Sequence, residues 1–146
     1  MRASRILPIL VGLLMLACTA EPPRPRVVIE TEAGRVMFRV ELAETDEARS
    51  RGLMGRERLA VDAGMVFLWP SDTETAFHMR ETLIPLSVAF FDADGRIVRM
   101  IDLEPCRADP CPAYAPGGPY RGALEVNAGE LARRGVRIGD HLRVER

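Results

Sequence analysis

Four side chains that can exchange protons or form hydrogen bonds fall within five consecutive residues. They supply an imidazole, a guanidinium, a carboxylate and a hydroxyl, in the order His78, Arg80, Glu81 and Thr82. Such groups are the usual participants in acid–base catalysis. In an extended segment, however, His78 and Glu81 point to opposite faces, and the sequence has no Gly-x-Ser-x-Gly turn to present a nucleophile. We therefore expect no catalytic residues, with a hydrolase that uses His78 and Glu81 as the alternative.

A second set of side chains offers soft ligands for a metal ion. Met54, His78 and Met79 would suit copper(I), which binds thioethers and imidazole. Most other methionines follow apolar strand patterns, where methionine normally fills gaps in a core. With two histidines in the chain and no His-Glu-x-x-His spacing, a catalytic zinc site is disfavoured. We expect no metal and no cofactor, with copper binding by Met54, His78 and Met79 as the alternative.

Glu125 and Asn127 form a polar pair on one face of a predicted strand, because they alternate with Leu124 and Val126. A buried glutamate needs a cationic partner to keep its charge, and arginine pairs well with carboxylates. We expect Arg51 to be that partner. The expected role is a structural ion pair, and ligand binding is the alternative.

Polar residues in three blocks, at 51–56, 78–82 and 125–127, define the candidate binding site. Isolated polar side chains are costly to bury, so they must satisfy one another or face a pocket. We expect the blocks to converge at one end of the domain, beneath a proline-rich segment at 105–119 that would act as a lid. The candidate ligand-binding residues are Arg51, Met54, His78, Met79, Thr82, Glu125 and Asn127.

Composition excludes several classes of protein. The chain has 146 residues, 47% of them hydrophobic and 28% charged, which is typical of one compact domain. The formal net charge is −1, so there is no basic surplus for nucleic-acid binding. Every basic residue apart from the histidines is arginine, which excludes lysine Schiff-base chemistry and a P-loop.

The N-terminus carries the features of a secretory signal. Arg2 and Arg5 precede an apolar run over residues 6–17, which is too short to span a bilayer as a mature helix. We therefore expect residues 1–17 to be a signal peptide.

The sequence MLAC at 15–18 resembles a bacterial lipobox, whose cysteine receives the lipid. We expect Cys18 to be acylated, with palmitate, and 18–26 to form a proline-rich tether before a single domain over 27–146. Thr19 lacks an acidic retention signal, so the resemblance to such lipoproteins favours the outer membrane, facing the periplasm. A soluble periplasmic protein is the alternative.

Cysteine usage agrees with export. Cys106 and Cys111 remain as an even pair, and disulfides persist in oxidising compartments. A structural metal site would normally need four ligands, and the segment adds only Asp109. We expect a Cys106–Cys111 disulfide that shapes a local turn.

Short β-rich runs separated by turn residues dominate the sequence after residue 26. The predicted strands are 27–31, 35–42, 65–69 ended by Pro70, 75–79, 86–91, 96–103, 121–126 and 141–144. The predicted helices are 46–51, between Thr45 and Gly52, and 128–134, closed by Gly135. Because parallel strands need long crossover connections, this pattern predicts an α+β, mainly β fold: a small antiparallel, barrel-like domain with two short helices.

Five blocks of the sequence resemble the DUF192 family and occur in the family's order. They are RGLMGR at 51–56, GMVF at 64–67, FHMRETLIPL at 77–86, LEVNAG at 124–129 and GD at 139–140. The resemblance extends from Val36 to the C-terminus, and it implies a single compact β-rich domain, often exported, whose activity is not established.

Three positions depart from the family pattern. The family usually has Trp where His78 stands, Asn where Glu81 stands, and Asp where Ser87 stands. The signal sequence, the lipobox-like MLAC, the tether and the lack of a catalytic set of residues together predict an exported, lipid-anchored, monomeric envelope domain. We expect this domain to bind a small ligand or a protein partner and not to bind nucleic acid.

Overall fold

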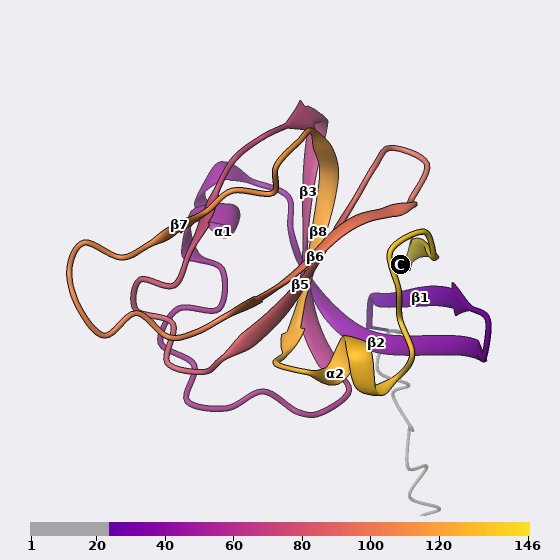
Figure 1. Ribbon diagram of the computed structural model, residues 1–146, viewed down its shortest axis with the longest axis horizontal. Coiled ribbons are helices and arrows are strands. Elements are labelled where there is room, and N and C mark those ends of the chain that lie inside the picture. Colours follow the sequence, from indigo (N-terminus) through magenta and orange to yellow (C-terminus); the bar gives the residue numbers. More distant parts are fainter. Residues whose placement is uncertain (1–23) are drawn as a thin grey trace, which may run out of the picture.

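A computed structural model of the protein describes residues 24–146. The predicted signal peptide at 1–17 and the predicted lipid site Cys18 lie outside the described residues. Nine strands and two short helices make up the described part (Figure 1). The strands are β1 Arg26–Thr31, β2 Gly34–Ala43, β3 Ala63–Thr73, β4 Phe77–His78, β5 Leu86–Phe91, β6 Ile97–Leu103, β7 Ala113–Tyr114, β8 Tyr120–Asn127 and β9 His141–Glu145; the helices are α1 Asp46–Arg51 and α2 Glu130–Arg133.

Seven strands form one sheet in the order β6-β5-β8-β3-β2-β1-β9, and β4 pairs with β7 in a separate ribbon. The N-terminal ends of the two edge strands of the large sheet, β6 and β9, lie side by side. Arg96 pairs with His141, and the Leu142 N–H donates to the Gly95 carbonyl at 2.7 Å. The sheet therefore curls into a partly closed barrel, which confirms the mainly β, barrel-like fold class.

Both predicted hairpins are present. In β1–β2, Val28 pairs with Met37 across the turn, and in β5–β6, Val88 pairs with Ile101. Asp92 and Gly95 shape the second turn, since the Gly95 N–H donates to the Asp92 carbonyl at 3.0 Å. Alternating apolar residues and turn residues were sufficient to place these pairs.

One strand pair differs from the antiparallel expectation, because β2 and β3 are parallel. The connection between them, residues 44–62, contains α1. A parallel pair needs such a crossover, and the short helix with its following turns provides one.

The strand predicted to stop at Pro70 continues to Thr73. The pairing with β8 is irregular between Leu68 and Thr73, so Pro70 lies where regular pairing is interrupted. A proline can occupy such a position because its missing N–H removes no ladder hydrogen bond there. The strand predicted at 75–79 is reduced to the two residues of β4.

The proline-rich segment is attached to β4 through one strand pair and contains an internal disulfide loop. Ala113 and Tyr114 form β7, in which Tyr114 pairs with Phe77 of β4. The Cys106–Cys111 disulfide is present, with Cα atoms 5.5 Å apart, as expected for such a bridge.

The large sheet is buried on both faces over β3, β5 and β8. Side chains of one face fill the barrel with α2 and β9, and those of the other face pack beneath α1, β4 and the loops. The inner core includes Phe38, Val66, Leu124, Val126, Leu131 and Leu142. The outer core includes Leu53, Phe67, Phe77, Met79, Phe90 and Tyr120. All six residues of β5 are buried, which explains why this strand is continuously apolar in sequence.

Both helices are short, with six residues in α1 and four in α2. The Thr45 hydroxyl accepts from the Ala48 N–H at 3.1 Å, as predicted for an N-cap. Neither helix of the described part has the length and apolar run needed to cross a bilayer.

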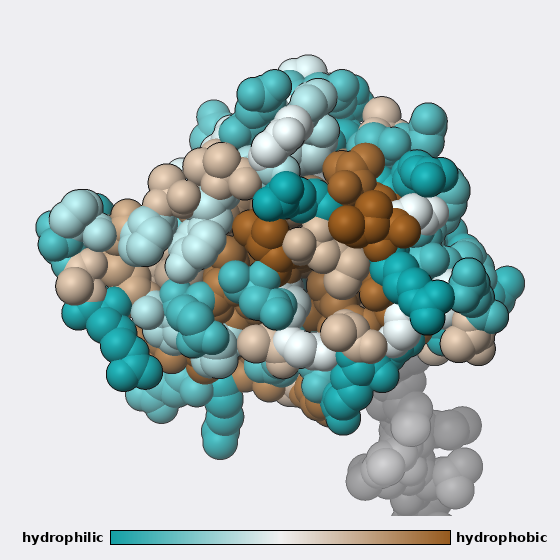
Figure 2. Space-filling model, in the orientation of Figure 1, coloured by the Kyte–Doolittle hydropathy of each residue, from teal (hydrophilic) through white to brown (hydrophobic). Residues whose placement is uncertain are grey.

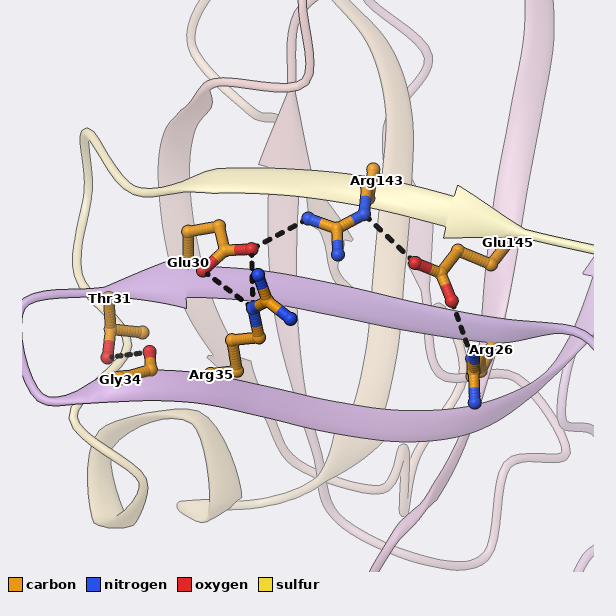
Figure 3. A network of polar contacts seen from close by, with 7 residues as sticks. All are labelled: Arg26, Glu30, Thr31, Gly34, Arg35, Arg143 and Glu145. Atoms are coloured by element: carbon orange, nitrogen blue, oxygen red, sulfur yellow. Dashed lines mark hydrogen bonds and ion pairs between the residues drawn. The ribbon is translucent and has the colours of Figure 1, made fainter.

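A chain of exposed ion pairs joins β1, β2 and β9 (Figure 3). Arg143 bonds to Glu30 at 2.7 Å and to Glu145 at 3.0 Å, and Glu145 accepts from Arg26 at 2.6 Å. The hydrogen bond from Arg143 lowers the pKa of Glu30. These strands therefore have a solvent-facing polar side opposite the barrel interior.

Candidate functional site

A cavity of about 330 Å³ lies between α1 with its following turn, the outer face of β3 and β8, and the segment around β4. Figure 2 shows apolar side chains reaching the surface among hydrophilic ones on the face drawn there. The residues of the cavity wall used below are Asp46, Arg49, Ser50, Arg51, Met54, Phe67, Trp69, Thr75, Phe77, His78, Thr82 and Glu125.

The strands place the cavity's aromatic and acidic groups by simple alternation. Phe67 and Trp69 are two residues apart on β3 and share the outer face. On β8, Leu124 and Val126 point into the barrel, so Glu125 between them points outward into the second layer. Glu125 stands opposite Met65 of β3 and Val88 of β5, and neither neighbour can pair with a charge.

Arg49 fastens α1 over this layer. Its guanidinium donates to the carbonyl oxygens of Glu44 and Leu68, each at 2.6 Å, and pairs with Asp46 at 2.5 Å. It also lies over the Trp69 ring, 5.4 Å from the centroid, within the range of a cation–π contact. Arg49 is therefore committed to holding the helix against β3.

Glu125 is buried and has no protein partner among residues 24–146. Its exposed fraction is 5%, and no described hydrogen bond or ion pair involves its carboxyl group. No unpartnered side-chain oxygen or nitrogen of a buried described residue is sealed from solvent, so the carboxyl oxygens open onto the cavity. Burial raises the pKa of Glu125 to about 8, because the charged form loses its hydration.

The predicted ion pair between Arg51 and Glu125 is wrong. Arg51 instead lies 3.5 Å from Glu47, one helical turn earlier, and its side chain is 66% exposed. Arg51 is the last residue of α1, and its guanidinium follows the solvent side of that helix. The residue still borders the cavity.

Five of the seven candidate ligand-binding residues surround the same cavity: Arg51, Met54, His78, Thr82 and Glu125. Two do not. Met79 is 1% exposed within the outer core. The Asn127 amide donates to the carbonyl oxygens of Leu59 and Ala60, at 3.0 and 3.1 Å, so it fastens the loop before β3.

The hydrolase and copper-binding alternatives each lack one of their proposed residues at the cavity. Glu81 is exposed and does not line the cavity, and no hydrogen bond links it to His78 in the described part of the chain. Met79 packs in the outer core and does not line the cavity, whereas Met54 and His78 do. Within residues 24–146, no three His, Cys, Asp or Glu side chains gather as they would around a metal ion.

The prediction that residues 105–119 form a lid over the candidate site is wrong. The proline-rich segment pairs with β4 through β7, which places its disulfide beside Arg80 around a separate hollow and outside the cavity wall. The residues missed by sequence analysis are Phe67, Trp69 and Phe77, which form aromatic walls. The i, i+2 spacing of Phe67 and Trp69 at the end of an apolar strand was the available signal.

Glu81 has a left-handed backbone, with φ of 54°, a region in which asparagine is favoured over other non-glycine residues. We predict that Glu81→Asn raises the free energy of unfolding by roughly 0.5–1 kcal/mol, because it relieves this backbone cost. Urea unfolding followed by tryptophan fluorescence measures the change. Glu74→Asn, at another exposed position without a positive φ, is the matched control, and an equal gain there would contradict the explanation.

Comparisons with known proteins identify relatives of this architecture. The DUF192 family model, described as "Uncharacterized ACR", matches residues 27–144. A solved structure of a proposed transcription regulator from Sinorhizobium meliloti 1021 is 32% identical, with a TM-score of 0.76, covering 82% of this chain and 92% of its own. A protein of unknown function from Novosphingobium aromaticivorans DSM 12444 is 34% identical, with a TM-score of 0.72, covering 81% and 83%. No curated protein matches the chain significantly.

Proposed function

The chain belongs to the DUF192 family, and we propose that it is a cell-envelope protein that binds a small molecule in the cavity beside Glu125 and is held at the membrane through a lipidated Cys18. The observation that carries the binding proposal is the buried carboxyl group of Glu125, which has no protein partner in residues 24–146 and opens onto a cavity. A polar group in such a place is stabilised when a ligand completes its hydrogen bonds.

The dimensions and walls of the cavity support a small ligand. Its volume of about 330 Å³ falls at the lower end of ligand pockets, which are mostly apolar with a few converging polar groups. Phe67, Trp69 and Phe77 supply the apolar wall, and Thr82 and Glu125 supply polar groups.

Binding without catalysis is favoured by what the cavity residues do. A hydrolytic site needs a nucleophile held by a base. Ser50, Thr75 and Thr82 carry the hydroxyl groups of the cavity wall, and no hydrogen bond links any of them to His78 in the described residues. The Thr82 hydroxyl instead donates to the Arg80 carbonyl oxygen at 3.4 Å.

Native mass spectrometry of the full chain purified from its own membranes tests the binding proposal. We expect a non-covalent mass of a small molecule in addition to the chain and its lipid. Ser50→Trp, which fills the cavity from the exposed face of α1, should lose that mass, and Ala132→Trp on the exposed side of α2 should keep it. A wild-type protein that carries no ligand would argue against the proposal.

The anchor is supported by the lipobox-like MLAC at 15–18 and by the proline-rich stretch before β1. We predict that wild-type protein sediments with membranes and incorporates labelled palmitate. Cys18→Ala should abolish labelling and release the mature chain into the soluble fraction, because a signal peptide cleaved without acylation leaves no anchor. Cleaved Cys18→Ala protein that stays in the membrane fraction would rule out lipidation as the cause of attachment.

A further inference from the structure

We infer that the ligand carries an organic ammonium group, whose N–H donors bond to the Glu125 carboxylate while its carbon skeleton lies against the aromatic wall. The inference rests on the proposed small-molecule function and names the chemical class of the ligand. It follows from three properties of the cavity.

The first property is a buried carboxyl group that has no counter-charge among the residues that the structure describes. Glu125 has no ion-pair partner among the described residues, and the two arginines of the wall are directed elsewhere. Arg49 bonds to carbonyl oxygens of Glu44 and Leu68, and Arg51 pairs with Glu47. Because a buried carboxylate is stable only when it is paired and hydrogen-bonded, a cation brought by the ligand completes the site.

The second property is the chemistry of the wall around that carboxylate. Phe67, Trp69 and Phe77 line the cavity, and aromatic rings attract cations through their quadrupole. An anionic ligand would be repelled by the ionised Glu125 carboxylate, and a neutral ligand would leave that carboxylate without a counter-charge. The Glu125 carboxylate and the aromatic wall therefore both favour a cationic head group.

The third property is a link between binding and protonation. Burial holds the pKa of Glu125 at about 8, so the carboxyl group must lose its proton before it pairs with an ammonium ion. The ionised fraction, and with it the apparent affinity, should rise about 50-fold between about pH 6 and pH 8. The other charged or titratable groups of the wall are Asp46, Arg49 and Arg51 from α1 and His78 from β4, while β3 and β5 place apolar Met65 and Val88 beside Glu125.

Three probes of matched size test the head group on the full chain: phenethylammonium, phenethyl alcohol and hydrocinnamate, which are cationic, neutral and anionic. Trp69 is the only tryptophan of the chain and lies in the cavity wall, so its fluorescence reports occupancy directly. At about pH 8 we expect phenethylammonium to bind at least about tenfold more tightly than the alcohol, and hydrocinnamate to bind most weakly.

Two charge-removing variants separate the buried carboxylate from the general charge of the surface. Glu125→Gln should weaken phenethylammonium binding by about tenfold or more, abolish its pH dependence, and leave phenethyl alcohol unchanged. Glu74→Gln removes the same charge from an exposed residue next to the wall residue Thr75 and should leave all three probes unchanged. Near-ultraviolet circular dichroism checks that both variants are folded.

The outcomes distinguish this inference from the function on which it rests. If the alcohol or hydrocinnamate binds the wild type as well as phenethylammonium does, the ammonium assignment is overturned and cavity binding stands. The same conclusion follows if Glu125→Gln leaves phenethylammonium binding unchanged or weakens all three probes equally. If no probe changes Trp69 fluorescence, the ammonium assignment is also overturned. The presence or absence of a co-purified ligand in native mass spectrometry then decides the proposed function separately.

Discussion

Glu125→Gln is expected to make the protein more stable than the wild type above about pH 5, by roughly 3–5 kcal/mol at about pH 9. The pKa of this carboxyl group is about 8 in the folded chain against a usual 4.5. The folded state therefore keeps a proton that the unfolded state has already lost. The associated stability is fully present below about pH 4.5 and is lost as the pH rises to about 8. Glutamine is uncharged and nearly isosteric with glutamate, so the variant should keep this stability as the pH rises.

Urea unfolding at a series of pH values from about 4.5 to 9 measures this difference. Wild-type stability should fall across the window relative to Glu125→Gln, and the two curves should approach each other at the acidic end. Glu74→Gln, which removes an exposed carboxylate, should follow the wild type. Parallel curves for wild type and Glu125→Gln would mean that Glu125 has a partner or is hydrated in solution.

Gly95→Ala should destabilise the fold by about 3 kcal/mol or more, because it combines backbone strain with a clash. Gly95 has a φ of +84°, and a Cβ atom there would lie 2.2 Å from the Leu142 carbonyl oxygen. The Gly95 carbonyl accepts from the Leu142 N–H at 2.7 Å, so the clash falls on the contact that joins the β5–β6 turn to β9. The barrel should open at this seam.

Gly135→Ala is the matched control. Gly135 has a similar φ of +76°, but no atom lies within 4 Å of the position that a Cβ atom would take, so only the backbone strain of about 1 kcal/mol applies. Chemical unfolding compares the two variants, and amide hydrogen exchange should show faster opening at Ile97 and Leu142 in Gly95→Ala alone. Equal losses in the two variants would mean that the seam contributes little to stability.

Local features of this protein were readable from the sequence. The β5–β6 hairpin follows from two apolar runs around Asp92 and Gly95, and α1 follows from the cap at Thr45. The disulfide follows from an even pair of cysteines at short spacing. In each case the interacting groups are close along the chain, so residue type and spacing determine the geometry.

The alternation on β8 was equally readable, and it placed Glu125 on a face separate from Leu124 and Val126. It did not reveal what that face meets. Arg51 was a chemically reasonable partner, yet the path of α1 directs it to Glu47. Pairing between distant residues depends on where each element packs, which residue spacing does not encode.

The tertiary structure decided the parallel β2–β3 pair, the β4–β7 ribbon and the cavity itself. Sequence alternation determines which side chains share a face of a strand, because that property is local to the backbone. Which layer covers the face is determined by long-range packing of α1 and the β4 segment over β3 and β8. The sequence therefore places Glu125 on the strand face opposite Leu124 and Val126, and both its burial and its opening onto an aromatic cavity are properties of the folded chain alone.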